Sequence, residues 1–363
     1  MQKKTQKNGK VELLRFLFSV IIMVFHAGNI PGFESRLFKT GAFAVEFFFI
    51  ISGYLMMASI ERSVSSQRVL SIGEETFLFL KKKITGIFPE IVISWLISVG
   101  IYIAGKNLDL RAAVDQVIKS LGDILLIKST GLNLGSVNGV VWYISAMLLV
   151  MAILYPLIKK HKSIMLHVVL PVAALVSLGY LCQETGTLRK PDQWLGLFTR
   201  GVPRAFAEIS IGAVCYPISQ KLADTHLTLK GKWLCTIVEW SIYLAMILFM
   251  HYGKSSKRDY FYVLILTVAV IITFSGQTVD VTWYNNKFCY WLGKFSLAIY
   301  LSHAAWCKLI TNFLPAGTAL KMQVLAYLSV SVVTAFVVYF LASLWRKVSP
   351  NVRAFLKEQF IAE

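Results

Sequence analysis

Charged residues are scarce in this sequence of 363 residues: they make up 15% of it, whereas hydrophobic residues make up 56%. A chain with so little charge and a mean hydropathy of +0.63 has far more apolar surface than one soluble core can bury. Its composition therefore excludes an ordinary soluble protein and predicts an integral membrane protein.

Acidic residues are scarcer than basic ones, with 19 Asp and Glu against 37 Lys and Arg and a net charge of +18. In a soluble protein this excess would suggest a nucleic-acid partner. Here, however, the basic residues cluster in short segments between apolar runs of membrane-spanning length. We therefore expect the lipid bilayer as a partner, with a basic face toward anionic headgroups, and no nucleic acid.

The five cysteines show no paired spacing and no CxxC, so we expect neither a disulfide framework nor a metal site. The sequence also lacks an HExxH motif, a P-loop, a GxGxxG segment, a Ser-His-Asp pattern and an internal repeat. It leaves no room for an appended soluble domain. We therefore expect a single domain over 1–363, with its chemistry among membrane helices.

Apolar runs indicate an all-α, polytopic membrane protein of about ten transmembrane helices, because each run can cross roughly 30 Å of hydrocarbon. The runs lie near residues 11–29, 41–60, 84–105, 138–158, 163–183, 201–220, 233–250, 260–276, 292–312 and 322–345. The first run follows several lysines, as a signal peptide would. Glu12, Arg15 and His26 interrupt it, so we interpret it as a retained helix.

One loop, 106–137, repeats apolar residues at three- and four-residue steps. This pattern predicts an amphipathic helix that lies on the membrane surface or covers a cavity, and a plain surface helix fits it equally well.

Ionisable residues inside the first span are the strongest functional candidates, since charge in a bilayer persists mainly beside a cavity or a partner. Arg15 and His26 are eleven residues apart, which is about 16 Å and three helical turns, so both face the same way. Glu12 shares that face and could fix the guanidinium of Arg15. An Arg15 that snorkels to lipid headgroups is the alternative.

Glu46 enters the second span at a depth similar to that of His26. A buried carboxylate beside a histidine can orient the ring, so we expect Glu46 to support His26 as a catalytic base, although a structural hydrogen bond would look the same. Trp142, Tyr143 and His303 are candidate substrate-binding residues. Interfacial aromatics and a helix-packing hydrogen bond are the alternatives for these three.

Three segments in order carry a resemblance to a known family. They are Glu12-Leu13-Leu14-Arg15 with His26 after ten further residues, the run Ala44-Val45-Glu46-Phe47-Phe48-Phe49-Ile50-Ile51-Ser52-Gly53-Tyr54, and the run Gly293-Lys294-Phe295-Ser296-Leu297-Ala298-Ile299-Tyr300-Leu301-Ser302-His303. Together they resemble acyltransferase family 3, integral membrane proteins that O-acylate bacterial surface polysaccharides and related glycans. The resemblance spans nearly the whole chain.

The resemblance implies an O-acyltransferase, most simply an O-acetyltransferase of the cell membrane. It implies acetyl-CoA or another acyl-CoA as donor substrate, no permanently bound cofactor, and a hydroxyl of a cell-surface polysaccharide or lipid-linked glycan as acceptor. His26 would deprotonate that hydroxyl. A transporter or flippase of a lipid-linked glycan is the rival function.

The donor's phosphates would bind Arg15 together with Lys82 and Lys83. The sequence departs from the family here, because a lysine and Gly86 stand where the family often has two arginines. Met147 also stands where an acidic residue is frequent.

We predict that both termini are cytoplasmic, because the number of spans is even and the loops assigned to that side hold the larger share of Lys and Arg. A reporter fused after Glu363 should show cytoplasmic activity. Activity on the opposite side of the membrane would overturn this topology.

Overall fold

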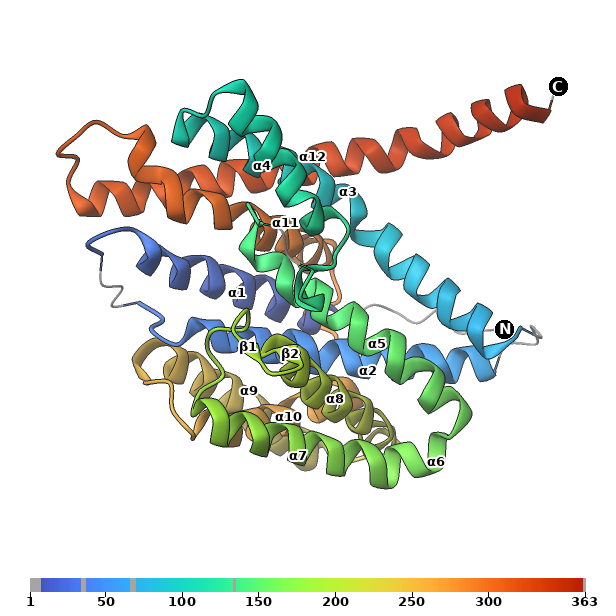
Figure 1. The fold of residues 1–363 in the computed structure, drawn as a ribbon. Coiled ribbons are helices and arrows are strands. Elements are labelled where there is room, and N and C mark those ends of the chain that lie inside the picture. Colours follow the sequence, from blue (N-terminus) through green and yellow to red (C-terminus); the bar gives the residue numbers. More distant parts are fainter. Residues whose placement is uncertain (1–7, 34–36, 66–69, 133–134, 362–363) are drawn as a thin grey trace.

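The computed structural model describes residues 8–33, 37–65, 70–132 and 135–361, and within them it is a bundle of helices with one two-residue hairpin (Figure 1). The predicted all-α class is therefore confirmed. The helices are α1 Gly9–His26, α2 Ala44–Val64, α3 Ile72–Lys106, α4 Leu110–Ile124, α5 Trp142–Lys160, α6 Lys162–Ile164, α7 Leu170–Thr185, α8 Gly201–Ala223, α9 Leu229–Tyr252, α10 Asp259–Ser275, α11 Lys287–Leu309 and α12 Leu320–Ile361. The strands are β1 Trp194–Leu195 and β2 Phe198–Thr199.

Each of the ten predicted apolar runs coincides with a helix of this bundle, although fewer meet the requirements of a membrane span. Within the described residues, seven helical segments are long and apolar enough to cross a bilayer: Gly9–Asn29, Gly41–Val64, Ile72–Lys106, Gly139–Lys160, Lys162–Thr185, Leu229–Tyr252 and Leu320–Val348. Helix α10 is apolar but shorter, and α8 and α11 carry buried polar side chains such as Arg204 and His303. A multi-pass membrane protein is supported, while the number of ten crossings stays a prediction.

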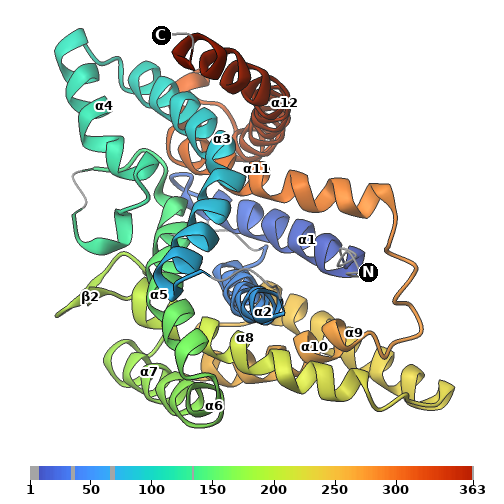
Figure 2. The ribbon, with the colours of Figure 1, turned by 90° about the vertical axis from the view of Figure 1, so that its right-hand side faces the viewer.

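Helix α1 lies inside the bundle, with α11 on one side and α2 on the other (Figure 2). It approaches α11 closely at Gly293, where an added Cβ would lie 1.8 Å from the Glu12 Oε2 atom. At its first residue, a Cβ on Gly9 would lie 1.8 Å from the Tyr284 carbonyl oxygen. Gly9 and Gly293 therefore allow α1 to pack closely against α11 and the segment before it, and this packing sets the position of Arg15.

Helices α2 and α8 cross through a reciprocal pair of glycines. A Cβ on Gly53 would lie 2.0 Å from the Ile209 carbonyl oxygen, and one on Gly212 would lie 1.9 Å from that of Ile50. Small residues that let two backbones touch are a standard device of membrane helix packing. The crossing aligns the preceding turns of α2 and α8, which carry Glu46 and Arg204.

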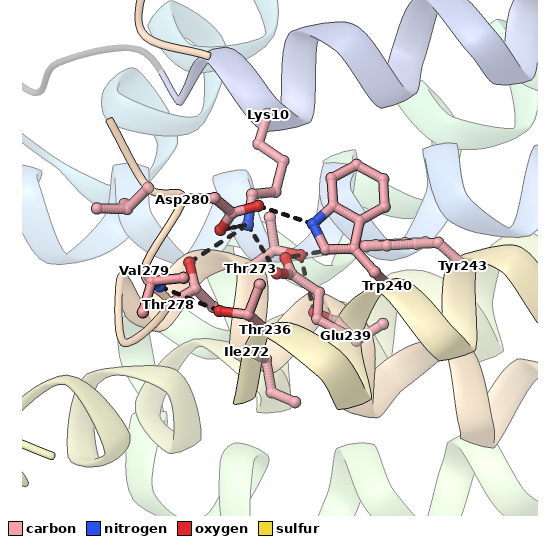
Figure 3. Close-up of polar contacts among 12 residues, drawn as sticks. Lys10, Thr236, Glu239, Trp240, Tyr243, Ile272, Thr273, Thr278, Val279 and Asp280 are labelled. Atoms are coloured by element: carbon pink, nitrogen blue, oxygen red, sulfur yellow. Dashed lines mark hydrogen bonds and ion pairs between the residues drawn. The ribbon is translucent and has the colours of Figure 1, made fainter. Parts of the chain in front are cut away.

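A buried ionic cluster holds the start of α1 (Figure 3). The Lys10 ammonium lies 2.7 Å from Glu239 Oε2 on α9 and 2.6 Å from Asp280 Oδ1 on the connection between α10 and α11, and it donates to Thr278 Oγ1 at 3.3 Å. The Trp240 indole donates to the other Asp280 oxygen at 2.7 Å. The charged groups are at most 2% exposed, so this cluster fixes α1 against the opposite side of the bundle.

The start of α1 and the later part of α12 lie at the same end of the bundle, because Glu12, Arg15 and Arg346 line one cavity. Arg346 also forms an ion pair with Glu90 of α3, and α12 then continues outward beyond the other helices (Figure 1). An even number of crossings would give this arrangement. Which side of a membrane this end faces stays a prediction.

Helix α4 is the amphipathic helix expected between residues 106 and 137. Its apolar side chains recur at three- and four-residue steps and are exposed: Leu110, Val114, Ile118 and Leu121, with Leu125 directly after the helix in the same series. On another face, the Trp95 indole of α3 donates to the Ser120 hydroxyl at 3.0 Å. An exposed apolar stripe of this kind is typical of a helix at a membrane surface.

We predict that Gly212→Ala destabilises the protein, because its new Cβ would meet the backbone of α2. Such overpacking costs about 1–3 kcal/mol, which should appear as a lower melting temperature of the detergent-solubilised protein. Gly100→Ala on α3 is the matched control, since a Cβ there meets no atom within 4 Å. Equal melting temperatures for the two variants would contradict the tight crossing.

Candidate active site

Three cavities follow α1 from its start to its end. The Arg346 cavity, of about 370 Å³, lies at the start of α1, and its polar lining consists of Glu12, Arg15, Glu90, Lys294, Ser343 and Arg346. The central cavity, of about 260 Å³, shares Arg15 with it. The His26 cavity, of about 320 Å³, lies at the end of α1. The two candidates predicted from the first span therefore face different cavities.

Arg15 stands at the junction of the first two cavities and lines both. Its Nη1 atom donates to Glu12 Oε2 at 3.0 Å, and one third of its side chain is exposed. The prediction that Glu12 fixes this guanidinium is confirmed. The remaining donors of Arg15 are available to an anion in either cavity.

The central cavity gathers polar side chains from several helices. Lys83 of α3 lines it beside Arg15. Its other polar lining residues are Ser19 of α1, Ser52 of α2, Tyr143 of α5, and Ser296 and Tyr300 of α11. The Tyr143 hydroxyl donates to the Phe48 carbonyl oxygen at 3.1 Å and lies 3.2 Å from Ser52 Oγ.

Lys82 is placed differently from Lys83. Its side chain is exposed, and it lines none of the three cavities. The structure therefore brings Arg15 and Lys83 together and leaves Lys82 outside.

The backbone of α1 determines which nitrogen of His26 can act as a base. Nδ1 lies 2.8 Å from the Ile22 carbonyl oxygen. A carbonyl oxygen only accepts, so Nδ1 carries the proton in that hydrogen bond and Nε2 keeps the lone pair of the neutral ring. The half-buried ring lines the His26 cavity.

His303 of α11 is the immediate neighbour of His26, with 4.9 Å between the ring centroids. It is fully buried, its Nδ1 lies 3.1 Å from the Ile299 carbonyl oxygen, and its Nε2 has no hydrogen-bond partner among the described residues. It is not among the residues that line the three cavities. His303 therefore packs beside His26 and is not part of the wall of these cavities.

Glu46 does not contact His26, so the expected pairing of these two residues is wrong. Its buried carboxylate accepts a hydrogen bond from Arg204 Nε of α8 at 3.0 Å and forms an ion pair with Nη2 of the same guanidinium. The physical reason is the α2 and α8 crossing, which turns Glu46 toward Arg204. The ring of His26 is oriented by its own helix backbone instead.

Arg204 lines the His26 cavity, whereas Glu46 does not. Glu46 therefore acts on this cavity only through its ion pair with Arg204. The Arg204 guanidinium lies 5.4 Å from the centroid of the Trp142 ring, a cation–π contact, and Trp142 lines the same cavity. A second buried carboxylate, Glu208, lies 3.5 Å from Arg204 Nε and has no hydrogen bond of its own among the described residues. Two carboxylates thus share one guanidinium.

Tyr300 and Val45 separate the central cavity from the His26 cavity, since both residues line both cavities. The Tyr300 hydroxyl donates to the Val140 carbonyl oxygen at 2.8 Å. The side chains of Val45 and Tyr300 therefore form a wall that the two cavities share, called the partition below. The hydrogen bond to Val140 fixes the phenol ring of Tyr300 against the segment that leads into α5.

Two acids lie outside the spans near the His26 end: Asp123 at the end of α4, which is buried, and Asp192 between α7 and β1, whose side chain is 57% exposed. Burial raises the pKa of Asp123, which accepts from the backbone amides of Val137 and Asn138 at 3.1 Å. Partial burial also raises the pKa of Asp192, although the nearby Lys128 ammonium opposes this shift. Asn138 in turn donates to the Leu301 carbonyl oxygen at 2.9 Å, which ties this loop to α11.

Several residues of the site were not singled out from the sequence. Arg204 and Glu208 are ionisable residues inside a predicted span, which is the signal that could have found them. Ser52, Ser296 and Tyr300 lie within the motifs quoted above. The loop residues Arg189 and Lys190, which line the His26 cavity, carry no such signal.

Comparison with known proteins gives one family match. The sequence profile of a family described as an acyltransferase domain matches residues 8–344, which is nearly the whole chain. No curated protein and no solved structure matches this chain.

We predict that Arg204→Gln destabilises the protein more than Glu46→Gln. Removing the guanidinium leaves two buried carboxylates without a cation, which typically costs about 3–5 kcal/mol, whereas Glu46→Gln leaves Glu208 to balance Arg204. Melting temperatures of the solubilised variants measure the difference, with Arg111→Gln on the exposed side of α4 as control. A larger loss for Glu46→Gln would refute this view of the cluster.

Proposed function

The chain belongs to the acyltransferase 3 family, and on that premise we propose that it transfers an acetyl or related acyl group from acyl-CoA to a glycan hydroxyl. The acceptor would be a cell-surface polysaccharide or a lipid-linked glycan. The observation that carries this proposal is the placement of Arg15 and His26 in separate cavities along α1, with Val45 and Tyr300 lining both the central cavity and the His26 cavity.

The Arg15 end suits the donor. Arg15, Lys83, Lys294 and Arg346 line the two cavities there, and fixed cations are what phosphate groups of coenzyme A require. Since Lys82 is exposed and outside these cavities, we assign the donor contact to Lys83 and leave Lys82 as a surface charge near the entry. Met147, at the place where relatives often carry an acid, lines the central cavity as an apolar wall for the thioester arm.

The His26 end suits the acceptor. Nε2 of His26 takes the proton of the acceptor hydroxyl while the oxygen attacks the thioester carbonyl. The tetrahedral intermediate then collapses, the carbon–sulfur bond breaks, and the coenzyme A thiolate leaves and takes up the proton that His26 had accepted, which restores the neutral imidazole. Both substrates meet at the partition, so no covalent enzyme intermediate is needed.

The other predicted residues take supporting places in this scheme. Trp142 forms a wall of the acceptor cavity, and Tyr143 forms a wall of the central cavity beside the thioester. Glu46 positions Arg204, and His303 packs against the catalytic ring. We propose the cell membrane as the location, with both termini cytoplasmic, so that acyl-CoA enters at the Arg15 end. Nothing in the comparisons supports the transporter alternative.

We predict that His26→Gln lowers acyl transfer by about 10²–10⁴-fold, the usual contribution of a general base. Label from radioactive acetyl-CoA would be followed into glycan with purified full-length protein, and melting temperature and donor binding should stay near the parent values. His167→Gln is a matched control, because His167 makes the same backbone hydrogen bond, to Ser163 at 2.8 Å, on an exposed surface. Robust transfer by correctly inserted His26→Gln protein would refute the mechanism.

We predict that Arg15→Ala raises the donor KM by about tenfold or more, because a hydrogen bond to a charged group is worth roughly 1.5–3 kcal/mol. Arg15→Lys should restore part of the loss, since an ammonium lacks the guanidinium fork. Lys82→Gln, outside the cavities, serves as control and should change KM less than twofold. A donor KM that Arg15→Ala leaves unchanged would sink the assignment of this end to the donor.

A further inference from the structure

The His26 cavity carries an excess of positive charge. Arg189, Lys190 and Arg204 line it, and no Asp or Glu is among its lining residues. Glu46 balances Arg204, but no ion pair joins Arg189 or Lys190 to a carboxylate within the described part of the chain. An occupant of this cavity therefore meets two cations that the described residues leave uncompensated.

Two acids of the neighbouring segments, Asp192 and Asp259, are engaged elsewhere. Asp192 follows Lys190 by two residues, but its carboxylate lies 3.8 Å from the ammonium of buried Lys128. Asp259 accepts from the Ser255 hydroxyl at 2.5 Å and from the Ser256 amide at 3.0 Å. Neither acid lines the His26 cavity, so neither removes the charge that the cavity presents.

The two cations stand on a segment that the fold holds in place. Arg204 Nη1 donates to the Leu188 carbonyl oxygen at 2.9 Å, and the Gly201 amide donates to the Pro191 carbonyl oxygen at 2.9 Å. Helix α8 thus binds the backbone on both sides of Arg189 and Lys190. The Arg189 guanidinium lies 5.6 Å from the centroid of the Phe25 ring. The buried ion pair of Arg204 thus helps to place the charges beside His26.

Aromatic and aliphatic side chains form the rest of the wall. Phe25, Trp142 and Tyr300 line the same cavity. Apolar walls with a few placed charged groups are typical of a small-ligand site, in which rings give contact area and charges fix the orientation. A sugar ring fits against such faces, whereas a headgroup of bulk lipid would use only the cations.

We infer that the acceptor in the His26 cavity is an anionic glycan, with Arg189 and Lys190 binding its negative group while the sugar hydroxyl faces His26. The negative group is a carboxylate of the sugar or a phosphate of its lipid carrier, since both present the oxygens that these cations recognise. This inference rests on the proposed function for the transfer step, but the preference for charge is a property of binding alone.

Equilibrium binding to the full-length protein in neutral detergent tests the inference. The radiolabelled probes are two matched pairs: trigalacturonate against neutral galactotriose, and polyprenyl-diphosphate galactose against polyprenyl galactose. We expect the anionic member of one pair to bind about tenfold tighter, the effect of one charged hydrogen bond, with the preference weakened by added salt. The pair that shows the preference identifies the source of the charge.

Variants then assign the preference to residues. The double variant Arg189→Gln and Lys190→Gln should abolish it, Arg189→Lys should keep most of it, and Arg111→Gln on α4 should keep all of it. Equal binding within both pairs, or a preference that survives the double variant, would overturn the inference. Competition by phosphatidylglycerol vesicles without any glycan preference would assign the cations to lipid headgroups and would also overturn it.

Label transfer from acetyl-CoA onto the same probes separates the two proposals. Transfer that is equally fast to neutral and anionic glycans would overturn the inference and leave the proposed function intact. An anion preference in binding without any transfer to the preferred probe would support the inference and count against the proposed function.

Discussion

A charge inside this helix bundle persists mainly beside an opposite charge or a cavity, because an unpaired ion away from water costs several kcal/mol. Ion pairs that meet this requirement between helices include Lys10 with Glu239 and Asp280, Glu46 with Arg204, Glu75 with Lys159, and Glu90 with Arg346. Each joins helices that are far apart in the sequence. The pairs therefore act as fixed points between helices whose apolar surfaces alone would pack in several ways.

The side chains assigned to chemistry are those that this pairing leaves available. Helix α1 is held at its start by the ion pairs of Lys10. Further along the helix, Arg15 lines the Arg346 cavity and the central cavity, and His26 lines the His26 cavity. Arg15 keeps donors beyond its bond to Glu12, and His26 keeps the lone pair on Nε2. The structural charges fix the helix, and the available groups along it face the cavities.

Local patterns predicted the parts of this arrangement that one helix determines. Apolar runs located the helices, and helical periodicity placed Glu12 beside Arg15 and put Arg15 and His26 on one face. The partner of Glu46 could not be found in this way, because Arg204 lies 158 residues away and meets it only through the glycine crossing of α2 and α8. The contact of His26 with His303 likewise depends on how α1 and α11 pack. Periodicity gives the face of a helix and not its neighbour.

The partition of Val45 and Tyr300 has a consequence for the membrane itself. Under the proposed topology, cavities approach it from both faces of the bilayer, so the same two side chains that bring thioester and hydroxyl together must also keep protons and salts from leaking down their gradients. The Tyr300 side chain, fixed by its hydrogen bond to the Val140 carbonyl oxygen, would then be part of the barrier to ions. A wider opening at Val45 and Tyr300 would accept longer acyl chains, but it would also let more ions cross the membrane.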